Sequence, residues 1–150
     1  MLVFALSCIK DQPKEIPSIK TLSVRNITAT SVAIGGEVTF DGNAAIFARG
    51  VCWSVNQAPI SKYKDSTTVD GTGSGIFNST VAGLKPGTTY YIKAYASNSV
   101  GTGYGNQLTA NITAVVPILT TSAISAISET IVNSGGNISS DGGSAIVARG

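Results

Sequence analysis

The sequence predicts an all-β protein, an antiparallel sandwich of about 100 residues followed by a truncated second copy. Three observations lead to this prediction. The chain is rich in Ser, Thr, Val and Ile and holds 17 glycines in 150 residues, the composition of strands and turns. Apolar and polar residues alternate along several short segments, whereas no long stretch repeats its apolar residues with the 3.6-residue period of a helix. The chain also repeats itself at an offset of 100 residues.

The repeat is the clearest signal. When residues 17–50 are aligned with residues 117–150, 14 of the 34 pairs are identical without a gap, and "DGNAAIFARG" (41–50) meets "DGGSAIVARG" (141–150). A repeat of this length fits one sandwich domain per unit. We therefore expect a complete domain at 17–115 and an incomplete one at 117–150, cut from a longer tandem array. The second copy lacks the residues that would cover its apolar face, so we expect it not to fold stably alone.

The first clear strand should span residues 31–40, because one face of the alternating segment is apolar. The residues expected on that face are Val32, Ile34, Gly36, Val38 and Phe40. Asp41-Gly42 predicts a turn after it.

Residues 45–55 should form the next strand, and its inward face is ambiguous. Val51 and Trp53 share one face, whereas Cys52 shares the other with Ile46 and Ala48. We place Trp53 on the core because it is the largest apolar side chain available.

The remaining elements follow in order. Residues 59–75 are polar and Gly-rich and predict mostly loop. Two further strands should direct alternate residues inward, namely Phe77, Ser79 and Val81 on the first and Tyr90, Ile92, Ala94 and Ala96 on the second. Residues 103–108 should close the domain, and residues 109–117 should form a linker.

A family resemblance lies in "LKPGTTYYIKAYASNSVGTGYG" (84–105). Leu84, Pro86-Gly87-Thr88 and Tyr90 resemble the L-x-P-G-T-x-Y element of fibronectin type III domains, and "ASNSVG" (96–101) resembles that family's A-x-N-x-x-G stretch. The resemblance implies an immunoglobulin-like sandwich with a tyrosine corner, in which the Tyr90 hydroxyl bonds back to the turn and Leu84 is structural.

Three short segments, "GGEV", "RGVCWS" and "GTGYG", are further similar to fibronectin type III-like repeats of Gram-negative bacterial surface lipoproteins. Gly35-Gly36 departs from the family pattern, which often places a core Trp there. We therefore expect Trp53 to serve as the aromatic anchor.

The amino terminus, "MLVFALSCIKDQPKEIP", resembles a bacterial lipobox at "ALSC". The resemblance implies that Cys8 is lipidated and attaches the protein to a membrane, so that residues 1–16 comprise a truncated lipoprotein signal and a polar tether. Only seven residues precede Cys8, and we expect the start to lie inside a longer signal peptide. The alternatives are an unstructured or wrongly assigned start, and a disulfide between Cys8 and Cys52. We favour Cys52 as a small buried hydrophobe.

Charge and composition argue against several functions. Ten basic and eight acidic residues give a net charge of +2, and no basic patch forms, so no nucleic-acid partner is expected. The chain has no His, which removes the commonest general base and zinc ligand. We therefore predict no enzymatic activity, no cofactor and no metal site.

Two sets of side chains are candidates for contacts. Tyr91, Lys93 and Tyr95 should form an outward stripe on one strand that contacts a glycan or a protein partner, although ordinary strand propensity explains these residues as well. Arg49 recurs as Arg149, which favours a structural role with its stem packed over Trp53. A binding role is the alternative.

These observations predict a non-catalytic spacer or adhesion module of a lipid-anchored surface protein. We expect it on the extracellular face of the bacterial outer membrane, or secreted. The alternative is an accessory module of a larger secreted glycan hydrolase or peptidase. A third hypothesis is direct glycan binding through Tyr91 and Tyr95.

Overall fold

The computed structural model describes residues 12–57, 66–123, 134–142 and 145–149. Within these residues the backbone forms nine strands: β1 (Ser18–Thr21), β2 (Ser31–Phe40), β3 (Ala48–Ser54), β4 (Gly75–Ala82), β5 (Thr89–Ser97), β6 (Thr102–Tyr104), β7 (Leu108–Asn111), β8 (Ile118–Thr121) and β9 (Gly136–Ser140).

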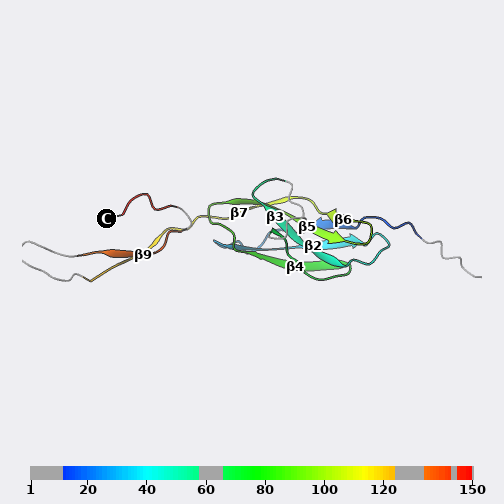
Figure 1. The fold of residues 1–150 in the computed structure, drawn as a ribbon, viewed down its shortest axis with the longest axis horizontal. Helices are drawn as coiled ribbons and strands as arrows, with labels where there is room; N and C mark the ends of the chain where they lie inside the picture. Colours follow the sequence, from blue (N-terminus) through cyan, green and yellow to red (C-terminus); the bar gives the residue numbers. More distant parts are fainter. Residues whose placement is uncertain (1–11, 58–65, 124–133, 143–144, 150) are drawn as a thin grey trace, which may run out of the picture.

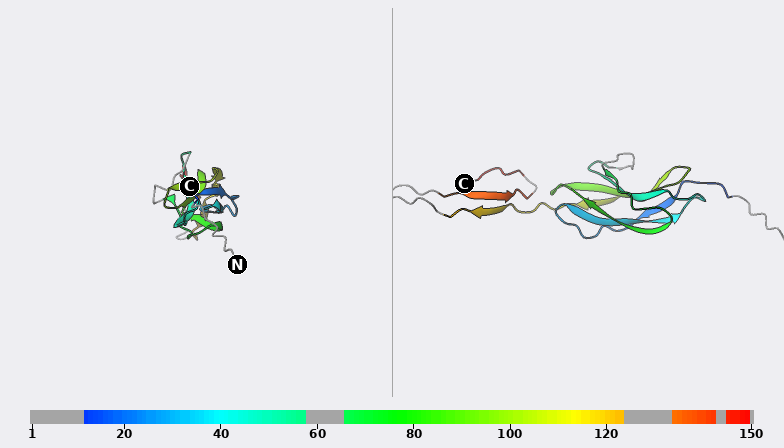
Figure 2. Two further views of the ribbon diagram at one scale, coloured as in Figure 1. Left: turned by 90° about the vertical axis from the view of Figure 1, so that its right-hand side faces the viewer. Right: turned by 60° about the horizontal axis from the view of Figure 1, so that its bottom comes forward.

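Strands β1 to β7 build two antiparallel sheets packed face to face, as Figure 1 and the right-hand view of Figure 2 show. One sheet has the order β1-β2-β4. In the other, β5 pairs with β3 on one edge and with both β6 and β7 on the opposite edge. This architecture confirms the predicted sandwich.

The alternation of β2 produces the core face of the first sheet. Val32, Ile34 and Val38 are buried, as the sequence pattern predicts. Phe40 is 38% exposed. The β1–β2 pairing explains the difference, because it shifts between Ser18 and Ile19 and the alternation is lost at this end of β2.

The core lies between the sheets and consists mostly of Val, Ile and Ala side chains. Its members are Val32, Ile34, Val38, Ile46, Val51, Phe77, Val81, Leu84, Tyr90, Ile92, Ala94, Ala96, Ala110 and Ile112. Trp53 packs against this cluster and is only partly buried.

A Cβ at Gly36 would lie 2.6 Å from the Ala94 Cβ and 2.6 Å from Phe77 Cζ. The aromatic ring beside the unusual glycine pair is therefore Phe77, not Trp53 as expected.

Part of the predicted loop 59–75 continues the second sheet instead. The Thr68 amide donates to the Val51 carbonyl at 2.8 Å, and the Asp70 amide donates to the Arg49 carbonyl at 2.7 Å. The segment around Thr68 therefore lies along the free edge of β3. Residues 58–65 lie outside the described residues.

The ends of the sandwich also differ from the sequence-based boundaries. Asn43 donates to the Pro13 carbonyl at 2.9 Å and the Glu15 amide donates to the Gly42 carbonyl at 2.8 Å, so residues 13–16 are held on the sandwich and are not a free tether. The predicted linker begins later than expected, because β7 extends to Asn111 and Ile112 is buried.

Strands β8 and β9 form a separate two-stranded sheet beyond one end of the sandwich (Figure 1). Their partners are Ile118 with Ser140, Leu119 with Ile138, Thr120 with Asn137 and Thr121 with Gly136. The β1–β2 partners are Ser18 with Phe40, Ile19 with Val38, Lys20 with Glu37 and Thr21 with Gly36. The two hairpins therefore share one register at an offset of 100 residues, including the position of the irregularity.

Candidate functional site

The expected outward stripe lies on the face of β5 that points away from the core. Strand β5 places Tyr91 beside Ser54, Lys93 beside Cys52 and Tyr95 beside Gly50. Tyr91 and Lys93 are half-buried, whereas Tyr95 is only 5% exposed. The structure therefore brings the three residues to one face and leaves only two of them accessible.

Tyr95 is buried because it reaches across Gly50 to the segment that extends the sheet. Its hydroxyl donates to the Thr68 carbonyl at 2.6 Å. A Cβ at Gly50 would collide with that same carbonyl, so a glycine is required where the segment passes. Burial, with a smaller contribution from nearby Asp70, raises the pKa of Tyr95. Its position is that of a packing residue, which corrects the expectation of an exposed contact.

A small polar network joins the two sheets at this edge. The Thr68 hydroxyl donates to Asp70 Oδ2 at 2.7 Å, lies 2.9 Å from the hydroxyl of Ser79 on β4, and accepts from the Val51 amide at 2.9 Å. Each of these groups thereby has a hydrogen-bond partner in a partly buried position. The arrangement stabilises the edge and presents no activated nucleophile.

Arg49 has a structural role that differs in detail from the expected one. Its guanidinium lies 5.3 Å from the centroid of the Phe77 ring and donates to the carbonyls of Gly73 and Ser74 at 3.0 and 2.8 Å. The expected packing over Trp53 is thus replaced by a cation–π contact with Phe77 and a clamp on the turn before β4.

Cys52 is free and fully buried. Burial raises the pKa of its thiol from 9.0 to about 11, with nearby Lys93 acting weakly in the opposite direction. The thiol is therefore protonated and unreactive at neutral pH. Cys8, the expected lipidation site, lies outside the described residues.

The tyrosine corner implied by the family resemblance is present in the geometry. The Tyr90 hydroxyl accepts a hydrogen bond from the Lys85 amide at 3.1 Å. Leu84 is buried at the same turn, and its amide donates to the Thr30 carbonyl at 2.9 Å. This corner ties the β4–β5 connection to the start of β2.

The opposite end of the sandwich is organised by Asn98, which is 3% exposed. Its side-chain amide donates to the Glu15 carbonyl at 2.6 Å and to the Asp41 carbonyl at 2.8 Å. Its side-chain oxygen accepts from the amides of Val100 and Gly101 at 2.9 and 3.1 Å. One side chain therefore fixes the entering chain, the β2–β3 loop and the β5–β6 loop together.

Four exposed apolar side chains belong to the segments that Asn98 holds together or adjoin them in the chain, and we call these four residues the Asn98 end. They are Ile16 (51% exposed), Phe40 (38%), Phe47 (64%) and Val100 (47%). Ile16 and Phe40 directly adjoin the two residues whose carbonyls Asn98 binds, and the Phe47 amide donates to the Ser97 carbonyl at 3.0 Å. The sequence pattern did not reveal this set, because Phe40 was assigned to the core and the other three lie in separate segments of the chain.

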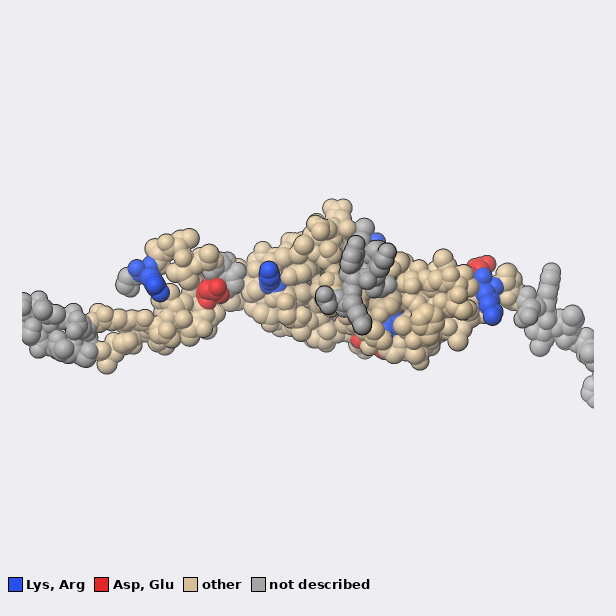
Figure 3. Space-filling model, in the orientation of Figure 1, with Lys and Arg blue, Asp and Glu red and all other residues tan. Residues whose placement is uncertain are grey.

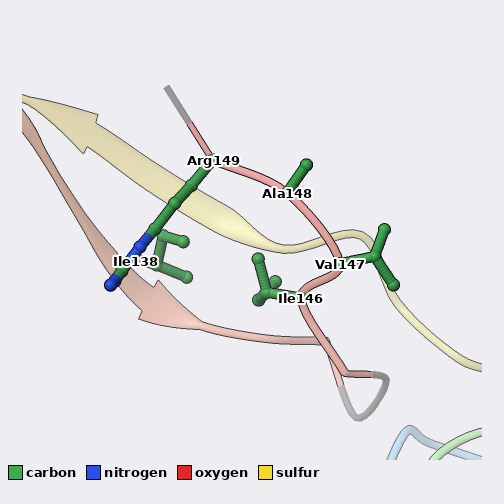
Figure 4. Close-up of a pocket in the computed structure, with 5 residues that line it drawn as sticks. All are labelled: Ile138, Ile146, Val147, Ala148 and Arg149. Atoms are coloured by element: carbon green, nitrogen blue, oxygen red, sulfur yellow. The ribbon is translucent and has the colours of Figure 1, made fainter.

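A hollow of about 440 Å³ lies near the carboxyl-terminal hairpin and is lined by Ile138 and residues 146–149 (Figure 4). In Figure 4, Ile138 and Ile146 face into the hollow, whereas Val147 points away from it. The residues 100 positions earlier, Val38 and Ile46, are buried in the sandwich core. The hollow thus corresponds to core space that other strands fill in the sandwich.

Within the described residues, no group of three or more His, Cys, Asp and Glu is placed to hold a metal ion. No described helix has the length and apolar character needed to span a membrane. Charged side chains are few and scattered on the face of the molecule shown in Figure 3.

The sandwich has a fibronectin type III-like fold. It is similar to the sixth fibronectin type III domain of human fibronectin type III domain containing protein 3, with 21% identity, a TM-score of 0.50, and coverage of 71% of this chain and 96% of that one. It is also similar to the sensor domain of the anti-sigma factor RsgI4 of Pseudobacteroides cellulosolvens, with 22% identity, a TM-score of 0.48, and coverage of 67% and 98%. No protein-family model and no curated protein sequence matches the chain. At these identities the similarity concerns the fold.

Proposed function

We propose that this chain is a non-catalytic spacer and contact module of a lipid-anchored bacterial surface protein, with residues 117–150 beginning a second unit of the same kind. The single observation that carries the proposal is the shared register of β1–β2 and β8–β9. A register is strongly specified where one face of a sheet is buried. Its repetition supports a second unit that buries the same face.

The connection between the units supports a spacer role. Ile112 is the last buried residue of the sandwich, and the Val115 amide already donates to the Gly142 carbonyl at 3.2 Å. The Glu15 amide makes the corresponding bond to Gly42. Only Thr113 and Ala114 lie between Ile112 and Val115, so consecutive units have little freedom to move relative to one another.

Completing the second unit tests this part of the proposal. A second copy of residues 51–112 would be appended to the chain after Gly150, because position 150 corresponds to position 50 in the repeat. We expect the amides of β8 and β9 to become protected from hydrogen exchange and to unfold in a cooperative transition. Unprotected β8 and β9 amides in the completed chain would contradict a second unit.

The membrane anchor is proposed at Cys8, on the outer membrane of a Gram-negative bacterium with the modules facing outward. The lipobox resemblance of "ALSC" supports it. Multiple acyl chains give stable attachment, at roughly 0.8 kcal/mol per buried methylene. Metabolic labelling with an alkyne fatty acid in cells that make the natural protein should label it, and a Cys8→Ala variant should lose the label. Equal labelling of both would contradict the anchor.

The contact role is proposed for Tyr91 and Lys93, the accessible part of the outward stripe. Half-exposed tyrosines present an apolar ring and a polar tip, which suits protein or glycan ligands. A glycan array probed with residues 12–115, before and after Tyr91→Ala, tests the glycan form. Binding that survives the substitution unchanged would remove Tyr91 from the contact.

A further inference from the structure

The Asn98 end is an apolar surface with no partner among the described residues. Its two Phe residues, Phe40 and Phe47, flank the β2–β3 loop and are the exposed members of the Phe residues that the structure describes, since Phe77 is buried. Burying such rings is favourable at about 25 cal/mol per Å² of apolar surface. Exposed apolar side chains that gather at one end of a module are candidates for a site of contact.

The chain itself brings this end close to Cys8. Pro13 is held on the β2–β3 loop by Asn43 Nδ2 at 2.9 Å. Five peptide steps separate Pro13 from Cys8, and at roughly 3.6 Å each they span at most about 18 Å. A lipid on Cys8 would therefore hold the Asn98 end, and not the tyrosine-corner end, near the bilayer surface.

The second copy differs at the corresponding positions. Ser140 stands where the first copy has Phe40, and Val147 where it has Phe47. The aromatic pair thus occurs in the copy next to the expected anchor and is absent from the copy farther along. Aromatic rings are well suited to the boundary between water and lipid headgroups.

We infer that the Asn98 end is a lipid-contacting surface, with Phe47, Phe40, Val100 and Ile16 resting in the headgroup region of the membrane. The inference rests on the proposed anchor at Cys8. The surroundings carry Lys14, Glu15 and Asp41, a net charge of −1, so the apolar side chains and not charge would provide the attraction to the bilayer. The sandwich would then stand on the membrane with its second unit directed away.

The test uses the full chain coupled through Cys8 to a maleimide lipid in phosphatidylcholine vesicles. Cys52 is fully buried and does not compete for the reagent. In a Trp53→Phe background, a Phe47→Trp variant reports on the Asn98 end. The matched control is Ile27→Trp, which lies in the β1–β2 loop at the other end of β2 and is similarly exposed at 48%.

Brominated phosphatidylcholine quenches Trp fluorescence on contact. For Phe47→Trp we expect the Trp fluorescence to fall at least twofold, with a blue shift of the emission. For Ile27→Trp we expect the fluorescence to fall by less than a tenth. Equal quenching at the two positions would overturn the inference, because no end would be preferred. Quenching at neither position would also overturn it and would favour a protein partner for this surface. Because the coupling is chemical, the result does not depend on whether cells lipidate Cys8.

Discussion

The β1–β2 and β8–β9 hairpins are the same local structure in two surroundings. They share a register, and the amides of Leu22 and Ser122 make equivalent bonds to the carbonyls of Gly35 and Gly135, at 2.9 and 2.7 Å. In the first hairpin Thr21 is 3% exposed, whereas every residue of β8 is exposed, with Leu119 at 66%. Strand β4 extends the sheet of the first hairpin and β5 belongs to the sheet packed against it, and neither has a counterpart at the second hairpin among the described residues.

The comparison distinguishes the features of the chain that pair two strands from the features that bury the paired strands. The turn that follows the second strand of each hairpin contains a left-handed glycine, Gly42 with a φ of 73° and Gly142 with a φ of 69°. A Cβ at either glycine would collide with a backbone carbonyl, that of Glu15 or of Val115. The two hairpins therefore share their register and the turn that follows them, whereas the strands that bury the first hairpin come from later in the chain. Isolated two-stranded hairpins are marginally stable at best.

The largest contrast is expected at the paired glycines Gly36 and Gly136. A side chain at Gly36 meets Ala94 and Phe77 at 2.6 Å, inside a packed core. Gly36→Val should lower the free energy of unfolding by about 3 kcal/mol. At Gly136 the nearest atom is the Thr120 carbonyl oxygen at 3.0 Å on an uncovered hairpin, and Gly136→Val should leave it unchanged. Urea denaturation followed by Trp53 fluorescence measures both, and equal losses would break the comparison.

The next contrast is between Val38 and Ile138, which occupy the same place in the two registers. Val38 is buried, so Val38→Ala removes two methyl groups from the core and should cost about 2 kcal/mol. Ile138→Ala removes more hydrocarbon from a half-exposed site that none of the described strands covers, and the urea midpoint should not move. A comparable shift for Ile138→Ala would mean that β9 contributes to the sandwich core.

A smaller effect is expected at Thr21 and Thr121. The Thr21 hydroxyl accepts a hydrogen bond from the buried Ala94 amide at 3.0 Å. Thr21→Val keeps the shape and leaves that amide without its partner, at a cost of about 1–2 kcal/mol. Thr121 is exposed, and Thr121→Val is its matched control. Thermal melts that do not distinguish the two variants would show that this bond contributes nothing.

The last contrast concerns alkaline pH and the difference between buried and uncovered regions. The pKa of Cys52 is raised to about 11 from an ordinary 9.0, so the folded state retains the proton longer than the unfolded state. This stabilisation is complete below pH 9 and is lost as the pH rises towards 11. The raised pKa of Tyr95 acts in the same direction.

In a Cys8→Ser background, the urea midpoint should fall between pH 9 and pH 11. A Cys52→Ala variant should show a smaller fall over the same range. Parallel slopes for the two proteins would assign the alkaline loss to other groups.

Much of the sandwich was accessible from the sequence, because period-two alternation reports directly on half-buried strands. Strand β2 occupies the predicted residues 31–40, and the inward residues of β4 and β5 are those expected. The tyrosine corner followed from a motif in which spacing and residue type are both constrained. The repeat at 100 residues corresponds to a shared register in β1–β2 and β8–β9, although the sequence pattern predicted no strand pairing in the second copy.

Other features depend on contacts that no local pattern encodes. The burial of Tyr95 depends on the passage of the segment around Thr68 beside β3, and that segment reads as polar loop. The pairing of Arg49 with Phe77 joins residues on different sheets. The Asn98 end combines the chain before β1, the end of β2 with the loop after it, and the β5–β6 loop, so its four apolar residues show no periodicity. Phe40 appeared inward because the sequence does not reveal the irregularity that ends the alternation.

Hydrogen exchange on the full chain, resolved by mass spectrometry, tests the central claim most directly. We expect slow, cooperative exchange for the amides of β2, β4 and β5, and exchange within seconds for those of β8 and β9. That result would show that the shared register gives pairing and that covering strands give stability. Protection of β8 and β9 equal to that of β2 would contradict the account.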